Sequence, residues 1–367
     1  MIRRKAWWRC VCLAVALAGA SAGSLGAQDS DRLFPISRDG KMGFIDRKGA
    51  EVVRPQFDSV GSFCEGLAWA SVGGKHGYID RTGAFVVKPQ YGNAWDFAEG
   101  LAPVYVRGGS KWGFIDRAGK RVIAPEYDSV RGFSEGLARV CIDYRYGYVN
   151  KAGAVVIALA YEDAGRFRGG LASVKKDGWW GYIDGKGEMV IKAQYDAAGE
   201  FEEGLAIVRT EGKEACIDKE GKELFRFDAV DGFSDGLSIA RSGEKHGYID
   251  RKGAWVLEPK FESAGWFCEG LASVTVGDKQ GYMDRTGKLV IEPRFAAAAP
   301  FSSGLAAVQT GDQKTGLWGY IDRTGKYVVE PRFARAGPFL DGIAAVELEE
   351  ESGYIDTRGK FVWGPAK

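Results

Sequence analysis

A seven-residue motif recurs ten times along the chain, and this repetition limits the possible folds more than any other feature. The first copy, Gly43–Gly49, reads Gly-Phe-Ile-Asp-Arg-Lys-Gly, and later copies begin at positions 77, 113, 147, 181, 215, 247, 281, 319 and 353. A spacing of about 34 residues indicates small structural units, each of which buries its apolar face on its neighbours. The 367-residue chain therefore need not be divided into two or three ordinary domains.

Each motif predicts a β-hairpin. In the second repeat, Tyr78-Ile79-Asp80 and Phe85-Val86-Val87 flank a few turn residues. The Asp side chain can accept hydrogen bonds from turn amides, and the closing Gly suits a position with positive φ. We therefore assign a structural role to the glycine that closes every copy, namely Gly49, Gly83, Gly119, Gly153, Gly187, Gly221, Gly253, Gly287, Gly325 and Gly359.

A third strand completes each predicted unit. A Leu-Ala-x-Val run precedes the motif and is expected to pair with Gly-Tyr-Ile-Asp across a turn such as Gly73-Gly74-Lys75. A proline, as at Pro55 and Pro89, is expected to end the last strand, because proline cannot donate to a ladder. Insertions before Gly113 and Gly319 lengthen the first hairpin by even numbers of residues, which preserves the strand register. We expect this turn to be exposed and tolerant of change.

The predicted fold class is therefore all-β, a repeat array of ten three-stranded antiparallel meanders. The repeats begin in phase at Leu33-Phe34-Pro35-Ile36 and stop after Phe361-Val362-Trp363, so no strand is left to complete the last unit from the other terminus. Propeller blades normally have four strands. Both observations favour an open, curved β-solenoid, with a closed β-propeller-like ring as the alternative.

Residues 1–27 have the pattern of a secretory signal peptide. Basic residues are followed by the short apolar run Val11–Ala18, with plausible cleavage after Ala22 or Ala27. The run is too short for a membrane span. Residues 28–367 would then form the mature repeat array, located in the periplasm or secreted. It retains 46 basic and 49 acidic residues and no basic run, which makes nucleic acid an improbable partner.

Several segments resemble WG-repeat (KWG) proteins. The resemblance rests on Trp112-Gly113-Phe114-Ile115-Asp116, on two similar segments at residues 180–184 and 318–322, and on recurring Pro-x-Tyr/Phe-Asp and Phe-x-Glu-Gly-Leu-Ala blocks. It covers about residues 33–363 and implies an all-β repeat protein, commonly bacterial, with no catalytic residues to carry over. The sixth motif, Ala215-Cys216-Ile217-Asp218, departs from the pattern.

Cysteine and histidine offer little for chemistry. Cys64 and Cys268 occupy equivalent positions six repeats apart, which an open array could not bridge. We interpret these two, with Cys141 and Cys216, as small hydrophobic residues, although a disulfide remains the alternative. His76 and His246 stand where other repeats have Trp, and no other ligand lies at metal-binding spacing.

Acidic residues are explained by their place in the repeat. A ladder of motif aspartates binding Ca²⁺ is an alternative, but a basic residue follows the Asp in most copies, and we favour turn formation with charge balance. No residue pattern indicates a catalytic site, a metal site or a cofactor.

Recognition is then the expected function. A repeat array presents variable positions on a constant frame, which favours a protein–protein interaction scaffold. The alternative is binding of envelope or extracellular glycan through tryptophans outside the consensus, because exposed aromatics suit sugar stacking as well as protein hot spots. These candidate ligand-binding residues are Trp69, Trp95, Trp179, Trp255 and Trp266.

Overall fold

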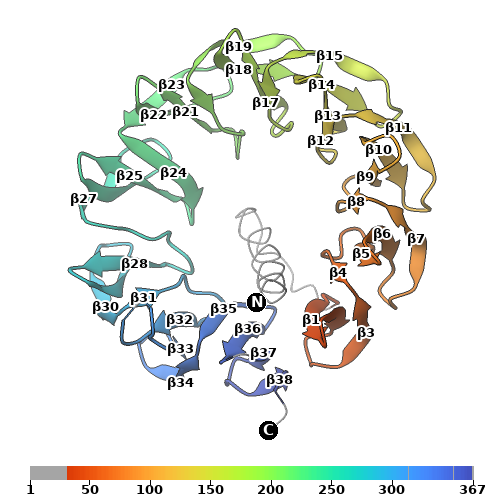
Figure 1. The fold of residues 1–367 in the computed structure, drawn as a ribbon. Coiled ribbons are helices and arrows are strands. Elements are labelled where there is room, and N and C mark those ends of the chain that lie inside the picture. The colour runs from red at the N-terminus through yellow and green to blue at the C-terminus, as the bar shows by residue number, and fades with distance from the viewer. Residues whose placement is uncertain (1–30, 313, 350, 366–367) are drawn as a thin grey trace. The chain divides into compact units, whose positions relative to one another are not determined.

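The computed structural model describes residues 31–312, 314–349 and 351–365. The predicted signal peptide lies outside the described residues. Within them the chain is all-β, as predicted, and no helix is long and apolar enough to cross a membrane. The chain divides into two compact units. Figure 1 labels their strands. The β4–β23 unit contains Ser37–Phe44 and Val52–Arg226, and the β24–β38 unit contains Ile45–Glu51, Phe227 onward and the described residues up to Ile36.

The first sheet contributes residues to both units and has three strands, β1 (Phe34–Arg38), β2 (Lys41–Ile45) and β3 (Glu51–Phe57). The β4–β23 unit then contains five antiparallel four-stranded sheets in chain order. Their strands are β4 (Ser59–Val60), β5 (Ala68–Val72), β6 (Lys75–Ile79) and β7 (Phe85–Tyr91); β8 (Asn93–Ala94), β9 (Leu101–Val106), β10 (Lys111–Asp116) and β11 (Arg121–Tyr127); β12 (Ser129–Val130), β13 (Leu137–Ile142), β14 (Arg145–Asn150) and β15 (Val155–Tyr161); β16 (Asp163–Ala164), β17 (Leu171–Lys176), β18 (Trp179–Asp184) and β19 (Met189–Tyr195); β20 (Ala197–Ala198), β21 (Ala206–Thr210), β22 (Lys213–Ile217) and β23 (Glu223–Phe227).

The β24–β38 unit contains four further sheets, of which the second has three strands and the others four. Their strands are β24 (Ala229–Ser234), β25 (Leu237–Ser242), β26 (Lys245–Ile249) and β27 (Trp255–Phe261); β28 (Leu271–Val276), β29 (Lys279–Asp284) and β30 (Leu289–Phe295); β31 (Ala297–Ala298), β32 (Ala306–Gln309), β33 (Trp318–Ile321) and β34 (Tyr327–Phe333); β35 (Arg335–Leu340), β36 (Ile343–Leu348), β37 (Glu351–Asp356) and β38 (Phe361–Trp363).

The prediction of three-stranded units is wrong for eight of the ten sheets. The additional strand has only two residues in six of these eight sheets, whereas β24 and β35 have six residues each. In the second sheet Ser59 pairs with Ser71, and Val60 pairs with Ala70. Two residues are too few to produce an alternating pattern that a sequence reader can detect. The additional strand forms one edge of the sheet, and the third strand of the predicted meander forms the other.

The motif hairpin forms because its Asp organises the turn. Asp80 Oδ1 accepts hydrogen bonds from the amides of Thr82 and Ala84 at 2.8 and 3.1 Å. The closing Gly83 has a φ of +85°, and a Cβ there would lie 2.6 Å from Cγ1 of Val53 in the preceding repeat. Glycine is therefore required both by backbone conformation and by close packing. All ten closing glycines have φ between +79° and +85°.

The expectation that proline ends the third strand is also wrong. Strand β7 continues to Tyr91, two residues beyond Pro89. A register shift between the pairs His76–Tyr91 and Tyr78–Val87 leaves an irregular stretch around Pro89. Because β7 is an edge strand, a residue without an amide proton interrupts the ladder locally without ending it.

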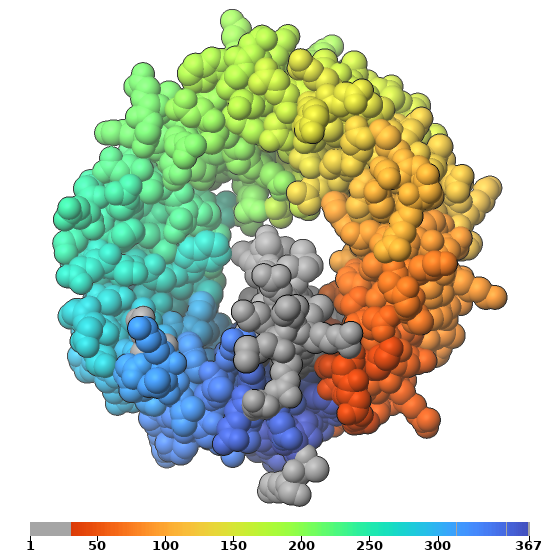
Figure 2. Space-filling model, viewed as in Figure 1, coloured from red at the N-terminus to blue at the C-terminus, as the bar shows by residue number. Residues whose placement is uncertain are grey.

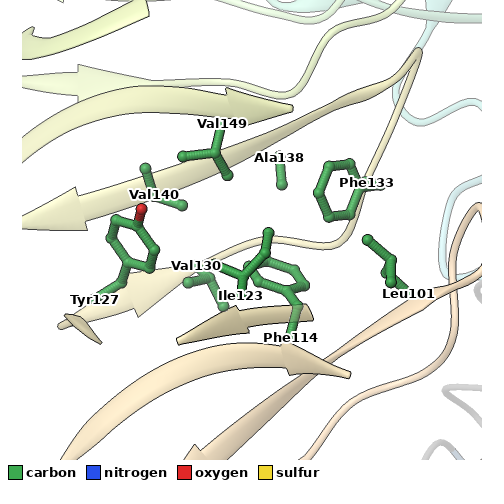
Figure 3. Close-up of a cluster of buried hydrophobic side chains, with 9 residues drawn as sticks. All are labelled: Leu101, Phe114, Ile123, Tyr127, Val130, Phe133, Ala138, Val140 and Val149. Atoms are coloured by element: carbon green, nitrogen blue, oxygen red, sulfur yellow. The ribbon is translucent and has the colours of Figure 1, made fainter. Parts of the chain in front are cut away.

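Successive sheets pack face to face through a repeated set of aromatic and aliphatic side chains. In the β4–β23 unit, Phe114 of one sheet meets Phe133 of the next edge-to-face, with ring centroids 5.1 Å apart. Figure 3 shows the apolar cluster around this pair. Leu101 of β9 and Tyr127 of β11 contribute to it from one sheet, and Val140 of β13 contributes from the next. The surface of this unit is continuous from sheet to sheet in the space-filling view (Figure 2, orange through green).

A buried tyrosine joins neighbouring sheets by a hydrogen bond. The hydroxyl of Tyr148 donates to the carbonyl of Gly165 in the next repeat at 2.7 Å. Tyr182, Tyr248, Tyr282 and Tyr320 donate in the same way to the carbonyl 17 residues further along. The motif tyrosine is therefore committed to the frame, and burial raises its pKa well above the ordinary value.

The open solenoid is wrong, because the first and last repeats contact each other within the β24–β38 unit. The Tyr354 hydroxyl donates to the Pro35 carbonyl at 2.9 Å, although 319 residues separate them. A Cβ on Gly49 would lie 1.9 Å from the Val362 carbonyl oxygen. These contacts are the tyrosine and closing-glycine contacts that join consecutive repeats elsewhere. An open array cannot provide them, and they agree with the propeller-like alternative.

The four cysteines of the repeat region are free thiols in the structure. Cys141 and Cys216 are buried, and Cys64 and Cys268 are partly buried. Burial raises the pKa of the Cys64 thiol to about 11, which keeps it protonated and unreactive at neutral pH.

Candidate binding surface

The first hairpin of several repeats presents an exposed apolar side chain at its tip. We call these turns the hairpin tips; they connect the second and third strands of a four-stranded sheet, or the first and second strands of a three-stranded sheet. Their exposed apolar residues, with relative exposure, are Val72 (41%), Tyr144 (88%), Trp179 (48%), Val276 (54%) and Leu317 (44%). The first three lie in the β4–β23 unit and the last two in the β24–β38 unit. The residue differs from repeat to repeat, while the strands that carry it are constant.

Tyr144 is the most exposed of these side chains because of its backbone. Asp143 and Tyr144 both have positive φ, 49° and 60°, the left-handed conformation of a tight two-residue hairpin turn. A bulky residue with positive φ is uncommon. Here it places a tyrosine ring outward at the tip between β13 and β14, where it is available to a partner.

A polar bridge from the preceding repeat supports several of the tips. Asp128 follows β11, and its Oδ2 accepts a hydrogen bond from the Asp143 amide at 2.9 Å. Its other oxygen accepts from Lys111 Nζ, and this bond, with the amide bond, holds the pKa of the Asp128 carboxyl below its usual value. Asp58 supports the second-repeat tip in the same way, through Lys41 and the Gly73 amide. The tips are therefore positioned by neighbouring sheets.

The structure places two of the five candidate tryptophans at half-exposed positions, in different units. Trp179 begins β18 at a hairpin tip and is 48% exposed. Trp266 is 46% exposed, and its indole nitrogen lies 3.4 Å from Asp231 Oδ2.

The other three candidate tryptophans are partly buried and pack against aromatic neighbours. Their ring-centroid distances are 5.5 Å for Trp69 and His76, 4.9 Å for Trp95 and Trp112, and 4.8 Å for Trp255 and Phe227. Trp95 and Trp112 thus form an aromatic pair, which is continued by Tyr105 at 5.4 Å from Trp112. The five candidates do not converge on one site within either unit.

At the opposite ends of the strands, the turns make hydrogen bonds and ion pairs that join neighbouring repeats. Glu65, at positive φ in its turn, accepts a hydrogen bond from the Gly100 amide of the next Glu-Gly turn at 2.9 Å. The basic residue after a motif Asp or Asn reaches back to such a turn, as Lys151 does to Glu99 at 3.0 Å. Arg285 reaches back in the same way to Asp235, at 3.7 Å, whereas in the tenth repeat Arg358 pairs with the motif residue Asp356 at 3.1 Å. No cluster of three metal-ligating side chains occurs among the described residues.

The carboxyl of Asp96 lies outside these turns and is largely buried. Asp96 precedes the core residue Phe97, and its carboxyl lies near the side chains of Trp69 and Cys64, which act to lower its pKa. Its Oδ1 atom is buried and has no hydrogen-bond partner among the described residues. Desolvation by burial raises the pKa of Asp96 to about 6, in spite of these two neighbours. Nearby, the buried Nδ1 of His76 also lacks a partner, and burial lowers the pKa of its imidazole.

A second exposed apolar row runs along the outer edge strands and has a simpler explanation. The second residue of the third meander strand is aliphatic and 37–46% exposed in nine consecutive repeats, at Val52, Val86, Val122, Val156, Val190, Leu224, Val256, Val290 and Val328. Because nearly the same residue occurs every time, β-propensity accounts for it. The row offers no variation for recognition, and it supplies matched control positions.

The fold and these surfaces define a β-sheet repeat protein whose frame is constant and whose hairpin tips vary. The chain belongs to the WG containing repeat family, whose repeat matches residues 42–75, 77–109, 112–146, 146–178, 180–213, 247–279, 281–313 and 318–350. The unmatched interval from 214 to 246 contains the irregular sixth motif. A comparison with curated proteins finds no match.

Similarity to solved structures is weak. Hsv2 of Kluyveromyces lactis has 8% identity and a TM-score of 0.36, with 70% of this chain and 94% of that chain covered. Hsv2 of Kluyveromyces marxianus has 10% identity and a TM-score of 0.35, with 60% and 89% covered. A streptogramin B lyase has 14% identity and a TM-score of 0.29, with 55% and 80% covered.

Sequence reasoning missed the apolar residues at the tips. The even insertions correctly indicated exposed first hairpins, but Tyr144, Val276 and Leu317 were not singled out. A search for apolar residues inside Gly- and Asp-rich turns would have found Tyr144, which lies between Asp143 and Arg145.

Proposed function

We propose that this protein is a non-catalytic scaffold that binds a protein partner through its hairpin tips. The observation that carries the proposal is that exposed apolar side chains at these tips change from repeat to repeat, with Tyr144 88% exposed and Trp179 48% exposed. Tyrosine and tryptophan are the residues most often found at binding hot spots. The supporting polar bridges hold the tips in place, which reduces the entropy lost when a partner binds.

The test compares a variant of two hairpin tips with a variant of the outer edge row. Tyr144→Ala with Trp179→Ala alters tips of two neighbouring sheets, whereas Val86→Thr with Val122→Thr alters the outer edge row. The chain from Gln28 onward and both variants are immobilised and exposed to envelope proteins of the source organism. We expect defined proteins to be retained by the wild type and the edge variant and lost from the tip variant. Equal retention by all three chains, or by none, would refute the proposal.

Glycan binding is the second candidate, favoured by the half-exposed rings of Trp179 and Trp266. Retention on insoluble cell-wall polysaccharide that is lost in Trp179→Ala and Trp266→Ala, but kept in Tyr144→Ala, would support glycan over protein. The Tyr144→Ala variant distinguishes the two functions, because Tyr144 belongs to the proposed protein-binding surface and not to the proposed glycan-binding surface.

We further propose that the protein acts outside the cytoplasm, in the periplasm or after secretion. The support is the sequence pattern of residues 1–27, in which basic residues precede a short apolar run and small residues follow.

A further inference from the structure

Two arginines stand directly opposite each other at the edge of the fourth sheet. The amide of Arg131 donates to the carbonyl of Arg139 at 2.9 Å, so the residues are cross-strand neighbours. Like charges in this arrangement destabilise a sheet. The equivalent positions in the sheets on either side carry Trp95 with Pro103, and Gly165 with Ser173. A costly departure from the repeat, confined to one sheet, is the kind of local conflict expected at a functional site.

Arg139 is held rigidly in this pair. Its Nη1 donates to the Ala164 carbonyl at 2.5 Å, and its guanidinium lies over the Tyr146 ring, 5.0 Å from the centroid. Its Nε is buried and has no hydrogen-bond partner among the described residues. Burial, and next the positive charge of Arg131, lower the pKa of Arg139. The two guanidinium groups are therefore close enough to interact unfavourably.

Arg131 is exposed and uncompensated. Its guanidinium lies over the Trp95 ring, 5.6 Å from the centroid. Trp95 in turn packs on Trp112 at 4.9 Å. Among the described residues no acid forms an ion pair with Arg131, and the acid nearest to Arg139 is Asp163, 3.7 Å from its Nη1. Asp163 therefore pairs with Arg139, and the charge of Arg131 has no ion-pair partner among the described residues.

We propose that Arg131, stacked on Trp95 and backed by Arg139, is a recognition site for a carboxylate of an acidic protein segment. A guanidinium fixed on an aromatic ring presents a planar pair of donors that matches a carboxylate, and stacking reduces the entropy lost on binding. An acidic sugar fits less well, because the guanidinium covers the Trp95 face on which a sugar ring would stack.

The inference rests on the proposed protein-binding role but not on the hairpin tips. The probe is a fluorescently labelled hexaglutamate peptide, titrated by anisotropy with the chain from Gln28 onward at low salt. We expect Arg131→Gln to weaken binding at least tenfold, because a charge-assisted hydrogen bond is lost. Arg131→Lys should retain part of the affinity, since it keeps the charge and loses the planar fork.

Arg121→Gln is the matched control. Arg121 is an exposed arginine on the edge strand β11 of the same unit, so the variant has the same net charge as Arg131→Gln, and its affinity should stay within twofold of the wild type. Equal weakening by both substitutions would show general charge attraction only and would overturn the proposal. So would an unchanged affinity of Arg131→Gln, or no binding of the peptide at all. Circular dichroism melting confirms that each variant is folded.

Two further arms separate this site from its alternatives. Oligogalacturonate that binds in an Arg131-dependent way while hexaglutamate does not would overturn the acidic protein segment in favour of an acidic glycan. The Tyr144→Ala, Trp179→Ala variant should bind hexaglutamate as the wild type does. A negative result for the hairpin tips would therefore not contradict the Arg131 site, and a negative result for Arg131 would not contradict the role of the tips.

Discussion

Replacing Asp96 by Asn should stabilise the protein at neutral pH. The Asp96 carboxyl is buried against Trp69 and Cys64, its Oδ1 has no partner, and its pKa is about 6 compared with an ordinary value of 3.8. At neutral pH the folded protein therefore contains a carboxylate that has lost much of its hydration. Asparagine has nearly the same shape and carries no charge, so the substitution removes this desolvation cost and leaves an oxygen next to Trp69.

The magnitude follows from the linkage between ionisation and folding. A folded pKa above the unfolded value means that the group stabilises the folded state fully below about pH 3.8, and that this stability is lost as the pH rises through about 6. With about 1.4 kcal/mol for each pH unit, the loss is at most about 3 kcal/mol. Asp96→Asn should therefore exceed the wild type by up to about 3 kcal/mol above pH 7, and by much less at pH 4.

Urea unfolding at pH 4, 5, 6, 7 and 8 checks this difference. His76 contributes in the opposite direction, because burial lowers the pKa of its imidazole. The stability that the neutral imidazole contributes to the folded protein is therefore lost as the pH falls below the pKa of His76 in the unfolded chain. Subtracting the wild-type curve from the Asp96→Asn curve cancels that contribution. A difference that does not grow between pH 4 and pH 7, or a variant that is less stable at pH 8, would refute the reasoning. The control is Asp128→Asn, which should destabilise the protein at neutral pH, because Lys111 and a backbone amide lower the pKa of Asp128.

Three further outcomes follow from the frame and the N-terminus. Gly83→Ala should lower the free energy of unfolding by about 1–3 kcal/mol. The loss should be larger than for Gly74→Ala, because both glycines have positive φ but only Gly83 faces a side chain within 4 Å. Urea midpoints of the two variants check this. Tyr354→Phe should cost as much as Tyr320→Phe, about 1–2 kcal/mol each, because each leaves a carbonyl without its donor; no cost for Tyr354→Phe alone would contradict the contact between the first and last repeats. The mass of the exported protein should correspond to a chain beginning at residue 23 or 28, and an exported chain that keeps residue 1 would contradict the signal peptide.

The sequence carried enough information to predict the class of fold and the motif hairpin. Asp80 and Gly83 act at fixed positions in one turn, and local chemistry determines both roles. The short strand Ser59–Val60 was not predictable, because its two residues are held by pairing with β5 and have no strand pattern of their own. The contact of Tyr354 with Pro35 was not predictable either. The hydroxyl has the same chemistry in every repeat, and only the three-dimensional course of the chain decides which carbonyl it reaches.

In the candidate sites, residues that follow the repeat consensus differ from residues that depart from it. Consensus groups are already engaged: the Tyr148 hydroxyl binds the next sheet, and the Glu65 carboxylate binds a neighbouring turn. Such groups are held in place by partners within the protein. Residues that leave the consensus, such as Arg131, Tyr144 and Trp179, lower the local fit or expose apolar surface without strengthening the frame. Recognition by this chain is therefore to be sought at positions where one repeat differs from its neighbours, and comparing equivalent positions within the single chain is enough to find them.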